Sequence, residues 1–345
     1  MIALLLAGGI AMLTSLLGTR WLIPWLQARG VGQNIRIEGP ESHQVKAGTP
    51  TMGGITIVTG AVLGYVFSHV RPGTVFTRGG LTVMLVIVGA ATVGLLDDWL
   101  GVTRARNLGL SKRAKSIGLL TVCATFIFLG LTWVDVRTDL SFTRYDSLGL
   151  DLGRVGWSIW AVLLIYGFSN AVNLTDGLDG LAAGSGAFSF MAFVIVAFWA
   201  FRHEATYQVP QALDLAVVAA SMAGACVGFL WWNAAPARIF MGDTGSLALG
   251  AGLASLSLLT NTHLLLPILG GVYVLQAVSV ILQVGVFRLF GGKRLFRMAP
   301  IHHHFELGGW PETTVIIRLW IVAGLCTFGA LGIYYADFIS TGAID

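Results

Sequence analysis

Ten stretches of mostly apolar residues alternate with short polar connections along the 345 residues of this chain. They cover residues 2–26, 52–69, 79–96, 116–133, 155–172, 181–201, 211–232, 245–260, 263–287 and 315–338. A helix of about 17 to 25 such residues spans the hydrocarbon core of a bilayer. The pattern therefore predicts an all-α polytopic membrane protein with about ten transmembrane helices in a single domain, residues 1–345. Pro267 and the Gly270-Gly271 pair interrupt the ninth stretch, so we expect that helix to be broken or bent.

The composition excludes an ordinary soluble domain. Hydrophobic residues make up 55% of the chain and charged residues 11%, and the mean hydropathy is +0.78. A net charge of +4 suits a nucleic-acid partner in a soluble protein. In a membrane protein, however, an excess of Lys and Arg usually reports orientation, so we expect no nucleic-acid partner.

The basic residues are distributed unevenly between the two sides of the predicted bundle. Thirteen of the 21 Lys and Arg residues fall on odd-numbered connections and six on even-numbered ones, while Arg20 and Arg318 lie inside predicted helices. The positive-inside rule then places the odd-numbered connections in the cytoplasm and both termini outside. The longest outer connection, about residues 134–154, alternates polar and apolar residues around turn formers. This predicts a small outer β-hairpin between the fourth and fifth helices.

Four acidic or histidine-rich clusters lie where apolar stretches end, and all four fall on odd-numbered connections. They are Asp97-Asp98, the DGLD run of residues 176–179, Asp243, and the HHHFE run of residues 302–306. Polar groups beside hydrocarbon are costly and are retained mainly where they bind, conduct or catalyse. The pattern therefore predicts one site on the cytoplasmic face.

Asp97 and Asp98 directly follow an apolar run. Two adjacent carboxylates repel each other, and a divalent cation such as Mg²⁺, or a proton taken up by one of them, relieves that repulsion. The alternative is a solvated helix end that the basic run from Arg104 to Lys115 neutralises.

The segment of residues 170–180, NAVNLTDGLDG, is the densest part of the chain in hydrogen-bonding side chains. Its glycines at 177 and 180 permit tight turns and close approach of a ligand. Asp179 is placed to cap the helix that starts at Leu181. Capping explains one aspartate, but not two asparagines and two aspartates together.

A third polar segment opens the eighth helix and consists of Asn233 and residues 238–246, RIFMGDTGS. A helix N-terminus attracts anions through its free N–H groups and its dipole, so residues 242–246 can hold a phosphate with Asp243 placing a divalent ion beside it. An N-cap role for Asp243 is the alternative. The ligands on offer are carboxylate and amide oxygens without a usable thiolate, which favours Mg²⁺ over zinc.

Two further segments have weaker or competing interpretations. In an extended loop, the first and third residues of the run from His302 to His304 would point the same way. Close to Arg294 and Arg297 they suit an anionic substrate better than a zinc ion, and a structural loop is the remaining alternative. The stretch from Lys46 to residue 54 offers hydroxyls, glycines and a lysine that suit phosphate, although an ordinary helix start has the same composition.

Together these segments resemble the polyprenyl-phosphate N-acetylhexosamine-1-phosphate transferase superfamily, and within it the phospho-N-acetylmuramoyl-pentapeptide transferases of the translocase I type. The motifs that carry the resemblance are GTPTMGG (48–54), LDD (96–98), NAVNLTDGLDGLA (170–182), FMGDTGSLALG (240–250) and PIHHHFE (300–306), with Gly309, Trp310 and Glu312. They cover nearly the whole chain in the same order. The histidine run and GTPTMGG favour this family over relatives that transfer GlcNAc-1-phosphate to the same lipid.

The resemblance implies a ten-helix enzyme of the bacterial inner membrane, commonly a homodimer, with its active site facing the cytoplasm. It implies transfer of phospho-MurNAc-pentapeptide from UDP-MurNAc-pentapeptide to undecaprenyl phosphate, which gives lipid I and UMP for peptidoglycan synthesis and requires Mg²⁺. Asp243 would ligate the metal, Asp97 would deprotonate the lipid phosphate, and Asp98 and Asp176 would support metal and phosphate. Around the uridine the resemblance places Gly177, Leu178, Asp179, Asn233 and Phe240, and it assigns the rest of substrate binding to Lys46, Lys115, Asn170, Asn173, His302, His303 and His304.

Two expectations and two alternatives accompany this resemblance. An undecaprenyl tail needs an apolar groove, for which the kinked ninth helix is the candidate wall. Family members usually carry a lysine where this chain has Gly101, so Arg104 or Arg106 would supply that phosphate contact. The alternative within the superfamily is a UDP-GlcNAc:polyprenyl-phosphate GlcNAc-1-phosphate transferase. A membrane transporter would instead need charges near mid-span rather than at one face.

Overall fold

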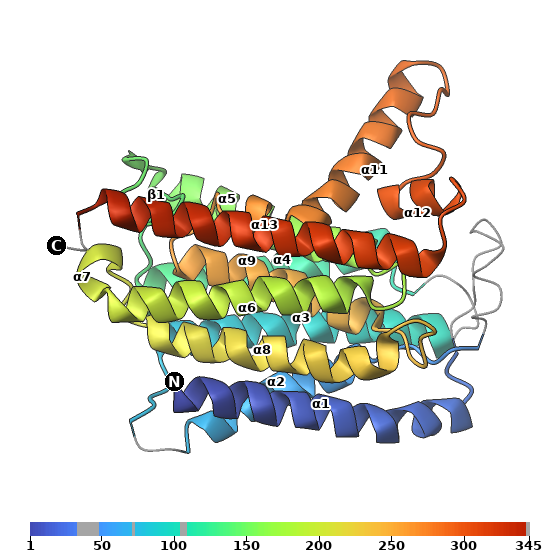
Figure 1. Cartoon of the computed structure of the whole chain (residues 1–345), viewed down its shortest axis with the longest axis horizontal. Coiled ribbons are helices and arrows are strands. Elements are labelled where there is room, and N and C mark those ends of the chain that lie inside the picture. The colour runs from blue at the N-terminus through green and yellow to red at the C-terminus, as the bar shows by residue number, and fades with distance from the viewer. Residues whose placement is uncertain (33–47, 71–72, 104–108, 343–345) are drawn as a thin grey trace.

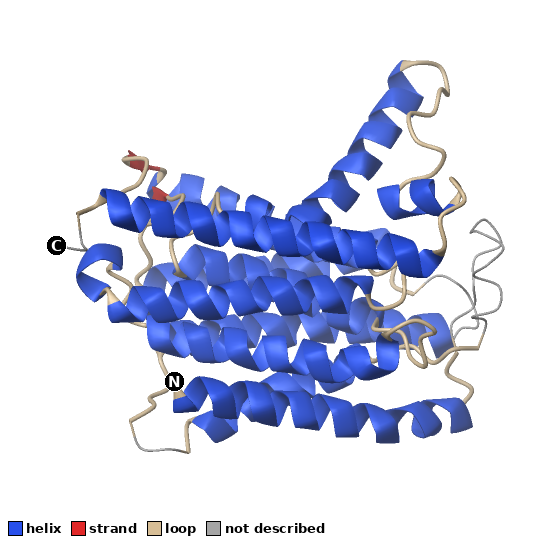
Figure 2. Ribbon diagram, viewed as in Figure 1, coloured by secondary structure: helices blue, strands red, loops and turns tan. Residues whose placement is uncertain are grey.

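The computed structural model describes residues 1–32, 48–70, 73–103 and 109–342, which are mostly helical (Figure 1, Figure 2). Within these ranges, eight helices are long and apolar enough to cross a membrane. They are α1 (Ile2–Ala28), α3 (Arg78–Thr103), α4 (Lys112–Leu129), α5 (Gly153–Thr175), α6 (Leu181–Arg202), α8 (Ala212–Asn233), α11 (Gly271–Leu289) and α13 (Glu312–Ser340). The prediction of a polytopic helical membrane protein is confirmed.

Two further helices coincide with the remaining predicted stretches. The apolar helix α2 (Gly54–Ser68) is shorter than the eight, and α9 (Gly242–Leu259) begins with the polar run GDTGS. Every one of the ten predicted stretches therefore contains a helix. The number of ten membrane spans itself stays a prediction.

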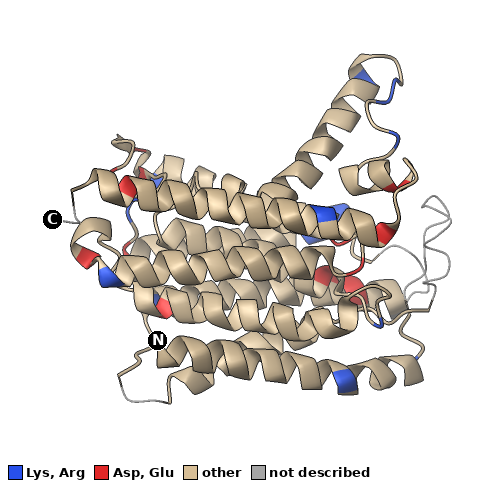
Figure 3. Cartoon of the chain, in the orientation of Figure 1, with Lys and Arg blue, Asp and Glu red and all other residues tan. Residues whose placement is uncertain are grey.

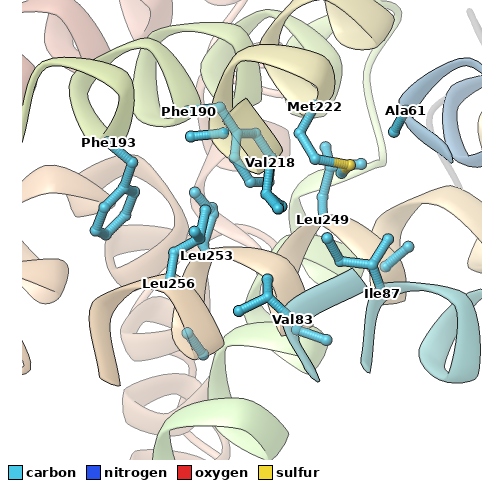
Figure 4. Packing of buried hydrophobic residues seen from close by; sticks show 14 of the residues in the cluster. Ala61, Val83, Ile87, Phe190, Phe193, Val218, Met222, Leu249, Leu253 and Leu256 are labelled. Atoms are coloured by element: carbon cyan, nitrogen blue, oxygen red, sulfur yellow. The ribbon is translucent and has the colours of Figure 1, made fainter. Parts of the chain in front are cut away.

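Helix α9 lies at the centre of the bundle. All its side chains from Thr244 to Leu259 are buried, and it packs chiefly against α3 and α5. Figure 4 shows Leu249 and Leu253 of α9 among apolar side chains of the neighbouring helices, including Ile87 and Phe190. Small residues on such a helix let adjacent backbones approach closely. The N-terminus of α9 is thereby held between α2, α3 and α5.

The ninth predicted helix is broken, as expected. It consists of α10 (Leu266–Leu269) and α11, which are separated at Gly270. After the break, α11 leans away from the other helices, and the short helix α12 (Ile301–Glu306) lies beside it (Figure 1). The break therefore directs α11 away from the bundle axis, and the chain then returns from its tip to α12 beside the start of α13.

The connection after α4 begins with a π-helical turn, Gly130–Val134, and contains the two short strands of the structure's one described sheet. Strands β1 (Asp139–Leu140) and β2 (Leu150–Asp151) pair antiparallel in the segment where the sequence predicts a hairpin. The start of α1, the end of α13 and the four-residue helix α7 (Glu204–Tyr207) lie at the same end of the bundle as these strands (Figure 1).

The opposite end of the bundle holds the polar chemistry. Figure 3 shows acidic residues at both ends of the bundle, with one group of them at the end where α12 lies. The start of α1 and the end of α13 thus lie opposite the acidic cluster, which agrees with the predicted alternation of connections. Which end faces the cytoplasm stays a prediction.

Two local predictions are wrong. Helix α3 does not end at residue 96 but continues to Thr103, so Asp97 and Asp98 lie on the helix itself. Residues 302–304 do not form an extended loop but belong to α12. In both places, polar side chains that find partners within the protein allow a helical backbone where hydropathy alone suggests a loop.

Candidate functional site

The candidate site is built where the N-terminus of α9 meets the ends of α3, α4 and α5. Polar side chains from all four helices form a connected group that includes Asp98 from α3, Lys115 from α4, Asn173 from α5 and Asp243 from α9. The residues lie up to about 145 positions apart in the chain. The fold therefore joins motifs that the sequence shows only as separate segments.

Asp98 acts as a cap for a helix other than its own. One carboxylate oxygen accepts the backbone N–H of Asp243 at 3.0 Å. The other accepts the backbone N–H of Thr244 at 3.0 Å and its hydroxyl at 2.6 Å. Helix α9 has no side-chain cap from its own N-cap residue, Met241, so Asp98 satisfies N–H groups that would otherwise lack partners. Its negative charge also lies at the positive end of the α9 dipole.

Asp243 lies in the first turn of α9, with both carboxylate oxygens bound by donors from neighbouring helices. Asn173 donates its side-chain N–H to Oδ1 at 2.6 Å and to the Ser246 hydroxyl at 2.9 Å. Lys115 forms an ion pair with Oδ2. Its ammonium thus supplies positive charge at the carboxylate that the sequence singles out as a metal ligand.

Asp97 completes a group of three converging carboxylates. Its Oδ1 accepts the backbone N–H of Leu110 at 2.9 Å, which ties the end of α3 to the start of α4. One oxygen from each of Asp97, Asp98 and Asp243 lies within 4.8 Å of the other two. Mg²⁺ prefers such oxygen ligands and keeps several waters beside one or two carboxylates. The donor chemistry of these three carboxylates fits Mg²⁺.

Asp176 adds a fourth acidic group just after the end of α5. Burial, followed by repulsion from Asp243 and Asp98, raises the pKa of Asp176 well above its usual range. A backbone hydrogen bond from Gly242 acts in the opposite direction. Concentrated negative charge of this kind favours a bound cation or proton, which agrees with the donor set of the neighbouring carboxylates.

Close backbone approach around Asp243 depends on glycine. A Cβ on Gly94 of α3 would lie 2.2 Å from the Asp243 carbonyl oxygen. A Cβ on Gly54 would lie 2.0 Å from the backbone nitrogen of Gly245. Neither position tolerates a larger residue unless the helices move apart. The first residues of α2 thus contribute space rather than ligands to the site.

The GTPTMGG segment joins the site through its backbone. Phe240 donates its N–H to the Pro50 carbonyl at 2.8 Å and accepts the N–H of Gly53 at 2.9 Å. Gly54 donates to the Met241 carbonyl at 2.8 Å. These bonds hold residues 50–54 against the start of α9 and leave Phe240 partly exposed.

Asp179 and Asn233 connect two loops. The Asp179 carboxylate accepts the backbone N–H of Ala237 at 2.9 Å, and its own N–H donates to Glu312 at 3.1 Å. Asn233 accepts the N–H of Gly180 at 3.1 Å and donates to the Ile239 carbonyl at 2.9 Å. The prediction that Asp179 caps α6 is wrong, because the N-cap is Gly180 and no side chain caps it. The short, left-handed turn at Gly180 directs the carboxylate to the other loop instead.

Two other residues that the resemblance assigns to substrate binding, Leu178 and Asn170, instead contact other parts of the protein. Leu178 is buried in a small apolar cluster with Leu181 and residues of α13. Asn170 donates to the Tyr166 carbonyl of its own helix at 2.7 Å, one turn away from Asn173. The structure does not bring the Asn170 amide into the group around Asp243, because that bond turns it back along α5.

The three histidines diverge within α12. His302 is buried, and its Nδ1 lies 3.0 Å from the Gln276 side-chain oxygen. The His302 and His303 rings are in contact, and a Cβ on Gly177 would lie 2.6 Å from His302 Nε2 and 3.6 Å from His303 Nε2. His304 instead accepts the backbone N–H of Arg297 at 3.1 Å. The first two histidines therefore face the DGLD loop, and the third stabilises the preceding loop.

Some predicted residues lie outside the described part of the chain, and some relevant residues were missed. Lys46, Arg104 and Arg106 fall outside the described ranges. Sequence reasoning missed the roles of Thr244, Ser246 and Gln276. Ser246 and Thr244 share the GDTGS motif with Asp243, which was a usable signal. Gln276 was signalled only as a polar residue inside an apolar stretch.

Comparisons with known proteins identify the family of this chain. Residues 80–261 match the family model described as glycosyl transferase family 4, and residues 46–58 match phospho-N-acetylmuramoyl-pentapeptide-transferase signature 1. Among similar curated proteins is the phospho-N-acetylmuramoyl-pentapeptide-transferase of Frankia alni, 48% identical over 98% of each chain. Proteins of the same name from Cutibacterium acnes and Streptomyces griseus are 46% and 45% identical, over 98% and 97% of this chain and 99% and 98% of theirs.

Proposed function

The chain belongs to the phospho-N-acetylmuramoyl-pentapeptide-transferase family, and we propose that it transfers phospho-MurNAc-pentapeptide from UDP-MurNAc-pentapeptide to undecaprenyl phosphate. The products are lipid I and UMP. The observation that carries this proposal is the convergence of Asp97, Asp98 and Asp243 with Lys115 and Asn173 at the N-terminus of α9. This is a site built for anions and a hard cation rather than for passage across the bilayer.

The reaction exchanges one phosphoanhydride for another. An oxygen of the lipid phosphate forms a bond to the phosphorus that carries the sugar, and the bond from that phosphorus to the UMP oxygen breaks. Both reactants are anions, so the protein must reduce their repulsion and hold them in line. Mg²⁺ held by Asp243 would supply charge neutralisation at the diphosphate.

The protein's own residues divide the remaining work. Lys115, beside Asp243, brings a cation to the phosphates and balances the acidic group. Asn173 fixes the orientation of the Asp243 carboxylate through its 2.6 Å hydrogen bond. Asp97 takes the proton from the lipid phosphate when that phosphate is protonated, and Asp98 maintains the geometry by capping α9.

The nucleotide end of the substrate fits the two loops joined by Asp179 and Asn233. Their hydrogen bonds hold residues 176–180 against residues 233–240, with Phe240 partly exposed at the edge and able to stack on a uracil. Gly177 lets the His302 and His303 rings pack against the DGLD loop, where these histidines are proposed to contact phosphate or sugar. In this proposal Asp179 and Asn233 shape the uridine pocket, and the ring of Phe240 contacts the base.

The lipid tail is proposed to lie along α11. This helix leans out of the bundle beyond its break at Gly270 and exposes apolar side chains that include Ile281, Leu282 and Val284. Its first half contacts α12, which carries the histidines, through Gln276 and Ser279. A separate apolar groove of about 340 Å³ lies between α1 and α2, lined by Trp21, Trp25 and Ile55 among others. We assign the tail to α11 because that helix also contacts the polar site.

The direct test is a reaction with purified protein, undecaprenyl phosphate and Mg²⁺. UDP-MurNAc-pentapeptide should release UMP and give lipid I, and UDP-GlcNAc should not. Release of UMP from UDP-GlcNAc alone would assign the protein to the other branch of the superfamily. The proposed cytoplasmic orientation is tested separately by labelling single cysteines from either side of the membrane.

A further inference from the structure

Helix α11 carries three polar side chains on one face, although it is otherwise apolar. Gln276, Ser279 and Gln283 lie at spacings of three and four residues, which align them along the helix. Polar side chains in a lipid-facing helix are costly unless they have partners. All three contact either the chain that returns from the tip of α11 or α12 itself. Figure 1 shows the course of this returning chain.

The outer two members of this row fasten the returning chain to α11. Gln283 accepts the backbone N–H groups of Leu295 and Phe296 at 3.0 and 2.8 Å and donates to the Phe296 carbonyl at 3.0 Å. The Ser279 hydroxyl accepts the N–H of Ile301, the first residue of α12, at 3.0 Å. Helices α11 and α12 are thereby fixed to each other through backbone groups.

The innermost member, Gln276, contacts a functional side chain instead. It is fully buried, and its side-chain oxygen lies 3.0 Å from His302 Nδ1 and 3.4 Å from the His302 backbone nitrogen. A backbone N–H can only donate, so the amide atom that faces it is the oxygen and not the nitrogen. That oxygen can only accept, so Nδ1 of His302 carries a proton.

We propose that Gln276 is a positioning residue that fixes His302 as the Nδ1–H tautomer, so that Nε2 is the nitrogen that faces the DGLD loop of the candidate site. The inference rests on the proposed function for the identity of the substrate, a sugar-linked diphosphate. The Nε2 atom is the one that points to the DGLD loop, since a Cβ on Gly177 would lie 2.6 Å from it. In the opposite tautomer, the lone pair of Nδ1 would face the lone pairs of the Gln276 oxygen. Turning the Gln276 amide over to relieve this would set its N–H group against the His302 backbone N–H.

This arrangement gives the two nitrogens of His302 separate tasks. Nδ1 stays bound to Gln276, whereas Nε2 accepts a hydrogen bond when the ring is neutral and donates one when the ring is charged. Any proton that His302 gains or loses therefore moves on the side that faces the DGLD loop. Loss of the Gln276 oxygen releases the tautomer and ring orientation, which lowers turnover by roughly tenfold to a hundredfold, as for other histidines deprived of their orienting partner.

The tautomer is measured directly by nitrogen NMR of the full-length protein in lipid nanodiscs, with ¹⁵N-labelled histidine and no substrate. The His302 signals are identified as those lost in His302→Asn. Wild type should show Nδ1 protonated. Gln276→Leu should lose that signature, and Gln276→Glu, which keeps an acceptor oxygen, should retain it. The control is Gln283→Leu, the same change on the same face of α11, which should leave the His302 signals in place.

Turnover provides the second readout. Gln276→Leu should lower kcat more than it raises KM, Gln276→Glu should restore part of the loss, and Gln283→Leu should lower kcat less than Gln276→Leu does. A wild-type His302 protonated at Nε2, or a Gln276→Leu protein with unchanged tautomer and kcat, overturns the proposal. The NMR result does not depend on the reaction, so a correct tautomer in a protein without transferase activity would count against the proposed function alone.

Discussion

The Asp98 carboxylate on α3 accepts the backbone N–H of Asp243 on α9 at 3.0 Å, so the side chain of one helix caps the N-terminus of another. The same carboxylate binds Thr244 twice. This contact fixes where Asp243 begins its helix and hence where its side chain points. The second aspartate of the LDD motif therefore has a positional role that differs from the roles proposed for Asp97 and Asp243.

Asp98→Asn tests that role. An amide offers one acceptor oxygen where the carboxylate offers two, and its NH₂ group would face an N–H of α9. We expect a loss of about 1–3 kcal/mol in the free energy of unfolding, together with lower turnover. Thermal unfolding in detergent measures the first effect. Asp135→Asn is the control, because Asp135 is exposed in a left-handed conformation that Asn also adopts. Equal stability of the two variants would contradict the capping role.

Lys115→Met is expected to reduce turnover by about tenfold or more, because it removes a cation from the phosphate site and from Asp243. Combined with Asp243→Asn, it should cost much less than the product of the two single effects, since both residues act through one contact. A double-mutant cycle on kcat/KM measures this coupling. Strictly multiplicative losses would show that the ion pair has no part in the reaction.

Gly94→Ala tests the close approach of α3 and α9. The added methyl group would lie 2.2 Å from the Asp243 carbonyl oxygen, so the helices must separate. We expect a loss of roughly 1–3 kcal/mol in stability and a marked fall in turnover. The same substitution at Gly101, where the nearest atom is 3.8 Å away, should have little effect on stability. A tolerated Gly94→Ala would show that this spacing is not required.

His263, in the connection between α9 and α10, predicts a pH dependence of stability. Burial lowers the pKa of His263 to about 4 from the usual 6.5. Because the unfolded state binds the proton more readily, stability should be constant above pH 6.5, fall as the pH drops below that value and level off near pH 4. The loss attributable to this residue is up to ~3 kcal/mol. Thermal unfolding of wild type and His263→Gln across this range measures it, and parallel curves would contradict the assignment.

Hydropathy located the helices because a bilayer imposes length and apolarity on every span. All ten stretches contain a helix, and Gly270 marks the break in the ninth. The end of α3 was placed too early because Asp97 and Asp98 are polar residues within a helix. Hydropathy cannot distinguish a polar side chain in water from one that caps a neighbouring helix.

The candidate site was predictable in its composition but not in its contacts. The sequence identifies Asp97, Asp98, Asp176 and Asp243 as one functional group because each ends an apolar stretch on the same side. It did not assign Asp179 to the loop of residues 233–240 or Gln276 to His302, since those pairs depend on tertiary packing. Contacts between distant segments depend on how the helices pack. The local pattern of polar and apolar residues does not show which distant segments meet.

The central claim is that the carboxylates at the start of α9 hold Mg²⁺ for phosphosugar transfer. It is tested most directly by UMP release from UDP-MurNAc-pentapeptide and undecaprenyl phosphate, for wild type, Asp243→Asn and Asp151→Asn, with and without chelation of Mg²⁺. The account predicts turnover by wild type and Asp151→Asn that stops on chelation and returns with added Mg²⁺. It predicts that Asp243→Asn loses at least about a hundredfold at saturating Mg²⁺. Turnover that persists without a divalent cation, or an Asp243→Asn protein as active as wild type, would contradict it.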